Sequence, residues 1–379
     1  MRPSGAGGTE AGTWIDAASG AAAQPIDAAD LVTIVLAFLA TLVGTIALRR
    51  VLIAASMMDI PNERSSHAAP VPRGGGVVFV VVALAAIASA IARGTLPAID
   101  AAAAAGILAV AGIGFLDDRR SVGAAPRLAV HLGASAAAIW AATHGMPAFA
   151  PVAGGLSAPF AAAIVLALAV ASAWCVNLVN FMDGIDGMAG FGGALILLSA
   201  AGIAAASGAA TSPGPWTTVV AIAAAVAAFG VVNISPWRIF MGDAGSGALG
   251  LALAWALVSL VKTGALEPLA GLALPAVFVA DATTTLAVRV ARREHPARAH
   301  RTHAYQRLVR AAWTHRSVTA AYAAVHLLVV VPVAWHAQRG GAHAALAVVA
   351  LYAMLALTAL RLGAGREPAQ PTNCPQAGA

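Results

Sequence analysis

Four polar side chains recur at every third position as an apolar run ends, in the segment Asn177-Leu-Val-Asn180-Phe-Met-Asp183-Gly-Ile-Asp186-Gly. On a helix, residues three apart are neighbours, so each of these side chains touches the next. A row of this kind is expensive at a membrane edge unless it has a partner. The two glycines break the helix and open backbone donors. The segment predicts a ligand site, with a structural polar seam between helices as the alternative.

A single carboxylate stands among glycine and serine in Phe240-Met-Gly-Asp243-Ala-Gly-Ser246. Mg²⁺ usually takes one or two carboxylates from a protein and completes its shell with phosphate and water. The backbone N–H groups at the start of the following helix are expected to receive an anion. The segment therefore predicts a site for a hard cation and a phosphate, and an ordinary helix cap is the alternative.

Two adjacent carboxylates, Asp117 and Asp118, end another apolar run and are followed by Arg119 and Arg120. Adjacent carboxylates repel each other, so one of them can have a raised pKa and accept a proton near neutral pH. The alternative is a solvated helix end in which the acids pair with the arginines that follow.

Two further loops carry groups suited to anions. Arg73 precedes three glycines that open a predicted helix, where backbone N–H groups let an anion approach closely; a flexible hinge in a basic loop is the alternative. The later loop contains His300, Arg301 and His303, which suit recognition of phosphates and of a sugar or base. No thiolate or further ligand pattern accompanies the two histidines, which argues against zinc.

The composition requires a membrane around these loops. Of the 379 residues, 60% are hydrophobic and only 10% are charged, with a mean hydropathy of +0.83. A soluble domain has about a quarter of its residues charged, so lipid must be the main solvent. The two cysteines, Cys175 and Cys374, are too few for a disulfide framework.

We predict an all-α integral membrane protein with about eleven transmembrane helices, because a bilayer core of about 30 Å needs roughly 20 apolar residues per helix. Of the 22 basic residues, 18 fall in one set of loops and 4 in the other, which places the N-terminus outside and the C-terminus in the cytoplasm. All of the segments described above then lie on the cytoplasmic side. The predicted spans are 31–48, 75–92, 98–116, 127–143, 158–177, 188–207, 217–234, 246–261, 268–288, 318–335 and 343–361.

Together these segments resemble the polyprenyl-phosphate N-acetylhexosamine-1-phosphate transferase family of glycosyltransferase family 4, which includes the MraY, WecA and WbpL enzymes; the likeness runs from about Asp59 to Arg307. The resemblance implies that Asp243 binds Mg²⁺, or Mn²⁺ in its place, with Asp183 as a second ligand. It also implies that Asp117 deprotonates or positions the lipid phosphate, with support from Asp118. The residues implied to contact the substrates are Arg73, Asn177, Asn180, Asp183, Asp186, Asn233, His300, Arg301 and His303.

The last loop separates branches of this family, because the MraY branch has consecutive histidines where this chain reads His300-Arg-Thr-His303-Ala-Tyr-Gln-Arg. The loop resembles that of the O-antigen-initiating branch, closest to the WbpL type, which argues against a peptidoglycan role. The implied reaction transfers a sugar phosphate from a UDP-N-acetylhexosamine to undecaprenyl phosphate and releases UMP.

Two alternatives remain open at this point. One is the same chemistry on UDP-MurNAc-pentapeptide. The other, from a different class, is a secondary transporter with intramembrane carboxylates. Almost every carboxylate lies at one rim, and only Asp281 lies well inside a span, which argues against a transporter.

The implied location is the bacterial inner membrane, with the active site facing the cytoplasm. The expected partners are the bilayer, undecaprenyl phosphate and the nucleotide sugar, with no nucleic acid; a homodimer is compatible with the sequence. We expect residues 1–30 and 363–379 to be disordered tails on either side of a transferase domain at 31–362.

Overall fold

The structure is a computed structural model that describes residues 28–61, 69–144, 158–208, 215–234, 236, 238–295 and 300–367. Residues 1–27 and 368–379, which hold most of the two predicted tails and Cys374, lie outside the described residues. Within the described part, residues 28–30 are helical and Gly365 N donates to Thr302 O, so regular structure extends a few residues into both predicted tails.

The described residues form helices and one small antiparallel strand pair, β1 (Met58–Asp59) with β2 (Val71–Pro72). The first helices are α2 (Ala28–Ala54), α3 (Val77–Ala92), η1 (Ala98–Asp100), α4 (Ala101–Arg119), α5 (Ala124–Thr143), α6 (Ala158–Met182), α7 (Met188–Ala206), α8 (Trp216–Ile234) and α9 (Gly242–Lys262). The remainder are α10 (Pro268–Ala273), α11 (Ala276–Ala291), α12 (Ala304–Arg310), α13 (His315–Val325), the π-helical turn η3 (His326–Val330), α14 (Val331–Gln338) and α15 (Ala344–Arg361).

Each of the eleven predicted spans coincides with helical residues. Among the residues that the structure describes, eight helices are long and apolar enough to cross a membrane. The eight are Ala28–Ala54, Ala98–Arg119, Pro159–Met182, Met188–Ala206, Trp216–Ile234, Gly242–Lys262, His315–Gln338 and Ala344–Arg361. Helix α3 is shorter and α5 is not among the eight, so the count of eleven stays a prediction. The predicted span at 268–288 is helical but interrupted, since α10 ends before Pro275, which has no N–H to continue the ladder.

The outer surface of the bundle is apolar. Leu36, Val43, Leu166, Leu328 and Leu346 are each more than half exposed, in positions where a water-soluble bundle would carry charges. A helix surface of this kind is suited to lipid, and with the eight apolar helices it defines an integral membrane protein.

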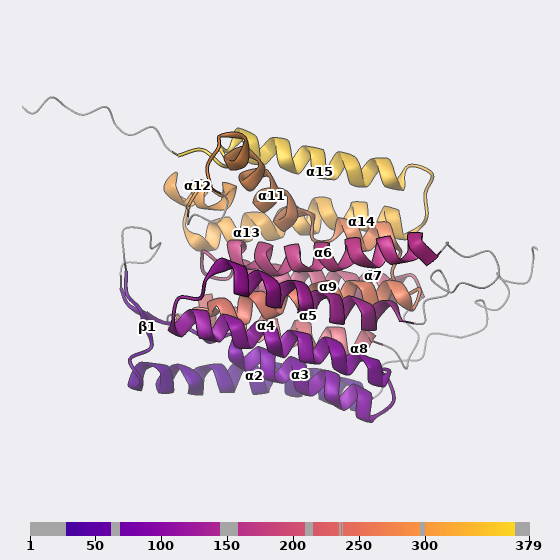
Figure 1. The fold of residues 1–379 in the computed structure, drawn as a ribbon, viewed down its shortest axis with the longest axis horizontal. Helices are drawn as coiled ribbons and strands as arrows, with labels where there is room; N and C mark the ends of the chain where they lie inside the picture. Colours follow the sequence, from indigo (N-terminus) through magenta and orange to yellow (C-terminus); the bar gives the residue numbers. More distant parts are fainter. Residues whose placement is uncertain are drawn as a thin grey trace, which may run out of the picture.

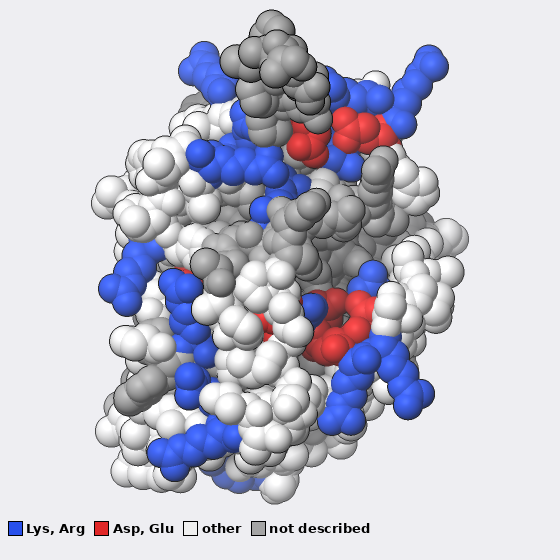
Figure 2. All heavy atoms as spheres, turned by 90° about the vertical axis from the view of Figure 1, so that its left-hand side faces the viewer, with Lys and Arg blue, Asp and Glu red and all other residues white. Residues whose placement is uncertain are grey.

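The helices run alternately up and down, so the loops after α2, α4, α6, α8 and α11 lie at the same end of the bundle, on the left in Figure 1. A view onto this end shows a patch of acidic side chains in a hollow, with arginine side chains around it (Figure 2). The polar segments identified in the sequence all belong to this end.

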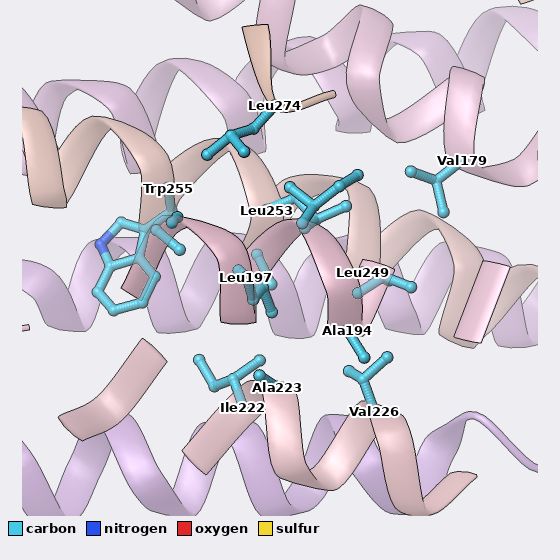
Figure 3. Close-up of a cluster of buried hydrophobic side chains, with 14 of the residues drawn as sticks. Val179, Ala194, Leu197, Ile222, Ala223, Val226, Leu249, Leu253, Trp255 and Leu274 are labelled. Carbon is cyan, nitrogen blue, oxygen red and sulfur yellow. The ribbon is translucent and has the colours of Figure 1, made fainter. Parts of the chain in front are cut away.

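Helix α9 forms the centre of the bundle and packs against α4, α6 and α7. Its buried side chains, among them Leu249, Leu253 and Trp255, meet residues of α6, α7 and α8 (Figure 3). Its glycines let other backbones approach: a Cβ on Gly245 would lie 2.7 Å from the Cα of Gly76, and one on Gly250 would lie 2.6 Å from the Cα of Val176. Small residues serve this purpose at helix contacts in membranes.

Among the described glycines, the closest approach to another backbone joins α4 to the start of α9, and it can be tested by adding one methyl group. A Cβ on Gly114 would overlap the backbone of Asp243, whereas a Cβ on Gly112, on the same helix, meets nothing within 4 Å. We expect Gly114→Ala to lower the free energy of unfolding by about 1–3 kcal/mol, as overpacking does. Gly112→Ala should be neutral or slightly stabilising, because alanine favours a helix. Thermal unfolding in detergent measures both variants; equal Tm values would contradict this packing.

Candidate active site

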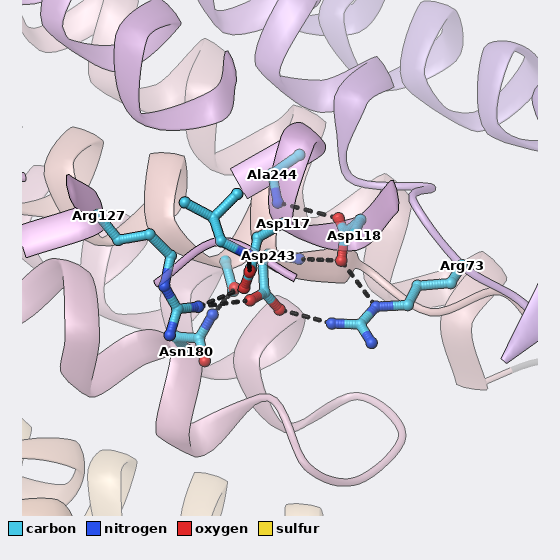
Figure 4. Close-up of polar contacts among 9 residues, drawn as sticks. Arg73, Asp117, Asp118, Arg127, Asn180, Asp243 and Ala244 are labelled. Carbon is cyan, nitrogen blue, oxygen red and sulfur yellow. Dashed lines mark hydrogen bonds and ion pairs between the residues drawn. The ribbon is translucent and has the colours of Figure 1, made fainter. Parts of the chain in front are cut away.

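Four chain segments meet in the acidic hollow at this end of the bundle. Arg73 follows β2, Asp117 and Asp118 end α4, Arg127 lies in the first turn of α5, and Asp243 begins α9. Their side chains point toward one another (Figure 4). Residues up to 170 positions apart in the sequence are therefore brought into direct contact.

Arg73 joins two of the carboxylates. Its Nε lies 2.7 Å from Asp118 Oδ1 and its Nη2 lies 2.6 Å from Asp243 Oδ1. Burial disfavours the charged guanidinium, but attraction to Asp243, Asp118 and Asp59 outweighs it and raises the pKa of Arg73. The forked guanidinium can contact two carboxylates at once, which an ammonium group cannot do with the same geometry.

Asp118 has a structural task beyond this ion pair. Its carboxylate accepts hydrogen bonds from Asp243 N at 3.0 Å and from Ala244 N at 3.3 Å, so it caps the first turn of α9. Gly242, with φ of 77°, makes the preceding turn. Our expectation that the N–H groups at this helix start receive a phosphate is wrong for these two groups, since a carboxylate of the protein already occupies them.

Asp117 faces the other side of the hollow. Its Oδ1 accepts from Val122 N at 2.7 Å and its Oδ2 pairs with Arg127, whose Nη1 also lies 3.3 Å from Asp243 Oδ2. Arg127 thus links Asp117 to Asp243 as Arg73 links Asp118 to Asp243. Our sequence reasoning missed this role; the signal available was a basic residue at the start of an otherwise apolar predicted span.

The three glycines after Arg73 act differently from our expectation. Gly74 N and Gly75 N donate to Phe240 O, and Gly76 N donates to Met241 O, so these backbone groups are not free for an anion. The glycines tie the first loop to the segment before Asp243, and Gly76 allows the close approach of α9 described above. They position Arg73 beside the two carboxylates.

The polar row at the end of α6 divides between two places. Asn180 Nδ2 donates to Ser246 Oγ at 3.1 Å, which places it beside Asp243, whereas Asn177 Nδ2 donates to Ala173 O one turn back in its own helix. Burial, followed by the charge of Asp243, raises the pKa of Asp183 well above its usual range; Asp118 and Asp186 act in the same direction. Asp183 is therefore a further acidic group at the edge of the hollow.

Asp186 belongs to a second cluster. Its Oδ2 lies 3.1 Å from both Arg238 Nη2 and His315 Nδ1. Asn233 accepts from Gly187 N and donates to Ile239 O at 2.8 Å, which ties the end of α8 to the loop after α6. In this structure Asp186 and Asn233 both connect loops, and their predicted contacts with the nucleotide stay predictions. His315 was not among our predicted site residues.

The predicted donor loop lies beside the end of α6. The ring of His300 is 4.9 Å from that of His303, which stacks on Phe181 at 5.8 Å between centroids. Burial, together with His303 and Arg289, lowers the pKa of His300 to about 3, so this imidazole is neutral at physiological pH. His303 is 2% exposed, whereas His300 and Arg301 are partly exposed. Of these three predicted site residues, His300 and Arg301 reach the surface.

The donor set fits Mg²⁺ only together with a substrate phosphate. Among the described residues, no group of three or more His, Cys, Asp or Glu side chains could hold a metal ion. Three carboxylates share the two arginines, and Asp183 adds a fourth acidic group, so the hollow has an excess of negative charge. Mg²⁺ needs one or two carboxylates and takes its other ligands from phosphate and water.

Comparisons with known proteins agree with this site. Residues 101–261, which include Asp117, Asp118 and Asp243, match the model of glycosyl transferase family 4. The chain is similar to this family over these residues, which make up less than half of its length.

The proteins that the chain is similar to include the following three. A decaprenyl-phosphate N-acetylglucosaminephosphotransferase of Mycobacterium tuberculosis is 31% identical over 211 residues, 51% of each chain. A probable undecaprenyl-phosphate N-acetylglucosaminyl 1-phosphate transferase of Bacillus subtilis is 27% identical over 76% of this chain and 79% of its own length. A phospho-N-acetylmuramoyl-pentapeptide-transferase of Thermosynechococcus vestitus is 34% identical over 48% and 50%, respectively. The chain thus spans about half the length of several curated relatives it matches.

The raised pKa of Asp183 predicts a stability that depends on pH. The folded protein binds this proton more tightly than the unfolded chain, so the associated stability is lost as pH rises above the ordinary aspartate pKa of about 3.9. In EDTA, we expect Asp183→Asn to remove this loss and to raise Tm relative to wild type from about pH 4 towards pH 7. Thermal scans across this range measure the difference.

Asp118→Asn is the matched control for this prediction. It removes a carboxylate that accepts two backbone hydrogen bonds and pairs with Arg73, so its Tm at pH 7 should fall. A lower Tm for Asp183→Asn than for wild type at pH 7 in EDTA would contradict this prediction, because it would show that the ionised Asp183 does not destabilise the folded protein.

Proposed function

We propose that the protein is a sugar-1-phosphate transferase that moves an N-acetylhexosamine phosphate from a UDP-sugar to undecaprenyl phosphate. The observation that carries this proposal is the contact of Asp117, Asp118 and Asp243 with Arg73 and Arg127 at one end of an apolar bundle. Carboxylates suit a divalent cation and arginines suit phosphate, and phosphoryl transfer needs little more than positioning and charge neutralisation. The names of the relatives support the same reaction.

The chemistry follows from the positions of these groups. An oxygen of the lipid phosphate attacks the β-phosphorus of the UDP-sugar, the bond to the oxygen bridging the two phosphates breaks, and UMP leaves. Asp117 would take a proton from the lipid phosphate or hold it in line, and Asp243 with Asp183 would hold Mg²⁺. When bound, the metal ion would supply charge neutralisation for the phosphates. Arg73 and Arg127 can turn from the carboxylates to the substrate phosphates.

We propose an N-acetylhexosamine donor, with N-acetylglucosamine as the first choice, because the relatives of Mycobacterium tuberculosis and Bacillus subtilis carry that sugar in their names. The His300–Tyr305 loop, which lacks consecutive histidines, supports a role in starting O-antigen or another surface polysaccharide. The relatives do not single out the WbpL type. One relative acts on phospho-N-acetylmuramoyl-pentapeptide, so that donor remains the second candidate.

The proposed setting is the bacterial inner membrane, with eleven spans and the hollow facing the cytoplasm, where nucleotide sugars are made. The 18 basic residues predicted on the cytoplasmic side support this orientation. A lipid phosphate would reach the hollow from the bilayer and the nucleotide would reach it from water. A homodimer is compatible with this arrangement.

Loss of charge at Asp243 or Asp117 should abolish the reaction without unfolding the protein. We expect Asp243→Asn and Asp117→Asn each to lower kcat by about 10²–10⁴-fold, the usual effect of removing a group that acts in the transition state. Transfer of labelled sugar to undecaprenyl phosphate by purified protein measures this loss. Glu267→Gln, an acidic residue at the opposite end, is the control and should retain wild-type turnover. Near-normal turnover by Asp243→Asn would overturn its proposed role with the metal.

A panel of donors tests the reaction itself. Purified protein with Mg²⁺ and undecaprenyl phosphate should form labelled lipid from UDP-GlcNAc or another UDP-N-acetylhexosamine, and EDTA should stop it. Product from UDP-MurNAc-pentapeptide alone would instead assign the second candidate. No product from any donor, with the protein folded by thermal scan, would count against a transferase.

A further inference from the structure

Asp281, in the second turn of α11, is 3% exposed, yet its carboxylate has partners on two other helices, α12 and α13. Its Oδ1 accepts from Ala304 N at 2.8 Å, and its Oδ2 accepts from Tyr305 N at 3.1 Å and from Tyr322 OH at 2.6 Å. Thr285 Oγ1 on the next turn of α11 lies 3.3 Å from Oδ1. A charge buried at this depth is retained only where such bonds satisfy it. Because these bonds account for the buried carboxylate, Asp281 no longer supports the alternative of a secondary transporter.

The two backbone donors belong to the first turn of α12. This helix has seven residues, which is too short to be stable alone, and the N–H groups of its first turn have no partner within the helix. A carboxylate from α11 supplies that partner, so the start of α12 is fixed to α11 and, through Tyr322, to α13. The residues immediately before it, His300 to His303, share this anchor.

The same turn is also attached to the end of α6. Tyr305 is fully buried, its hydroxyl donates to Phe181 O at 2.8 Å, and a Cβ on Gly184 would overlap that hydroxyl. Phe181 in turn stacks on His303. Asp281, Tyr305 and Phe181 thus form a continuous connection from α11 to the segment that carries Asp183.

We propose that Asp281 is a positioning residue for the nucleotide sugar: it holds the main chain of 303–305 so that His300 and Arg301 are presented beside the hollow. This inference rests on the proposed function, in which those two residues contact the donor. Asp281 touches no substrate itself. Its loss should therefore weaken use of the donor and leave use of the lipid unchanged.

An amide cannot replace this carboxylate. The two oxygens together accept two backbone N–H groups and one phenol, whereas asparagine offers one oxygen and one NH₂ group. One backbone N–H at the start of α12 then loses its acceptor. Tyr322→Phe removes only the phenol and leaves both backbone bonds, so it is the milder variant.

The experiment measures KM for UDP-GlcNAc, KM for undecaprenyl phosphate and amide hydrogen exchange of residues 300–306 in full-length protein. For Asp281→Asn we expect a donor KM raised about tenfold, a lipid KM within about twofold of wild type, and faster exchange of Ala304 and Tyr305. For Tyr322→Phe we expect a rise of the donor KM of about two- to threefold. The second variant keeps the test decisive where the first folds poorly.

Asp100→Asn is the matched control. Asp100 is also 3% exposed and accepts one hydrogen bond, from Trp255 Nε1 at 2.9 Å, but it lies at the far end of α4, roughly 25 Å from Asp117 by helix rise. It should change Tm without changing either KM. If both Asp281→Asn and Tyr322→Phe kept the wild-type donor KM, or if both changed the two KM values equally, the positioning role would be wrong. A wild-type protein that used no UDP-sugar would instead overturn the proposed function, whatever the exchange data showed.

Discussion

The structure depends on keeping several carboxylates in one hollow at the end of an apolar bundle. Asp117, Asp118 and Asp243 would repel one another if each were unpaired, and Arg73 and Arg127 hold them together by bridging neighbouring pairs. The close packing of α4 on α9 is needed to bring the acids within reach of these arginines. The charge cluster and the packing of α4 on α9 are therefore one constraint, because Asp118 at the end of α4 both pairs with Arg73 and caps the first turn of α9.

Much of the fold and of the candidate site could be predicted from the sequence, because long apolar runs indicate the helices and the polar residues at their ends indicate the end of the bundle where the site lies. Every predicted span coincides with helical residues, with a break before Pro275 in one of them. The segments carrying Asp117 and Asp243 meet, as does the end of α6 just before Asp183. The spacing of residues in the sequence, however, does not predict which acceptor a backbone N–H will bond to in the folded protein. Both predicted anion sites, at Gly74 and at the start of α9, are instead paired within the protein.

What the sequence could not supply were partners contributed by distant elements. In the sequence, Arg127 is one basic residue among several; in the structure, its position on α5 brings it to Asp243 of α9. Asp281 is an isolated acid in an apolar run, and its hydrogen-bond partners on α12 and α13 are known only from the structure. The break before α11 has a local cause in Pro275, which could have been weighed against the apolar run. For Arg127 and Asp281, by contrast, tertiary contacts decided the role.

The most direct test of the account is to determine which bond of the nucleotide sugar breaks. Purified protein would be given undecaprenyl phosphate, Mg²⁺ and UDP-GlcNAc that carries one label on the β-phosphorus and another on the sugar. A hollow that acts on phosphorus predicts both labels in the lipid product, with one UMP released for each lipid formed. Release of UDP, with the sugar label alone in the lipid, would contradict sugar-phosphate transfer at this site.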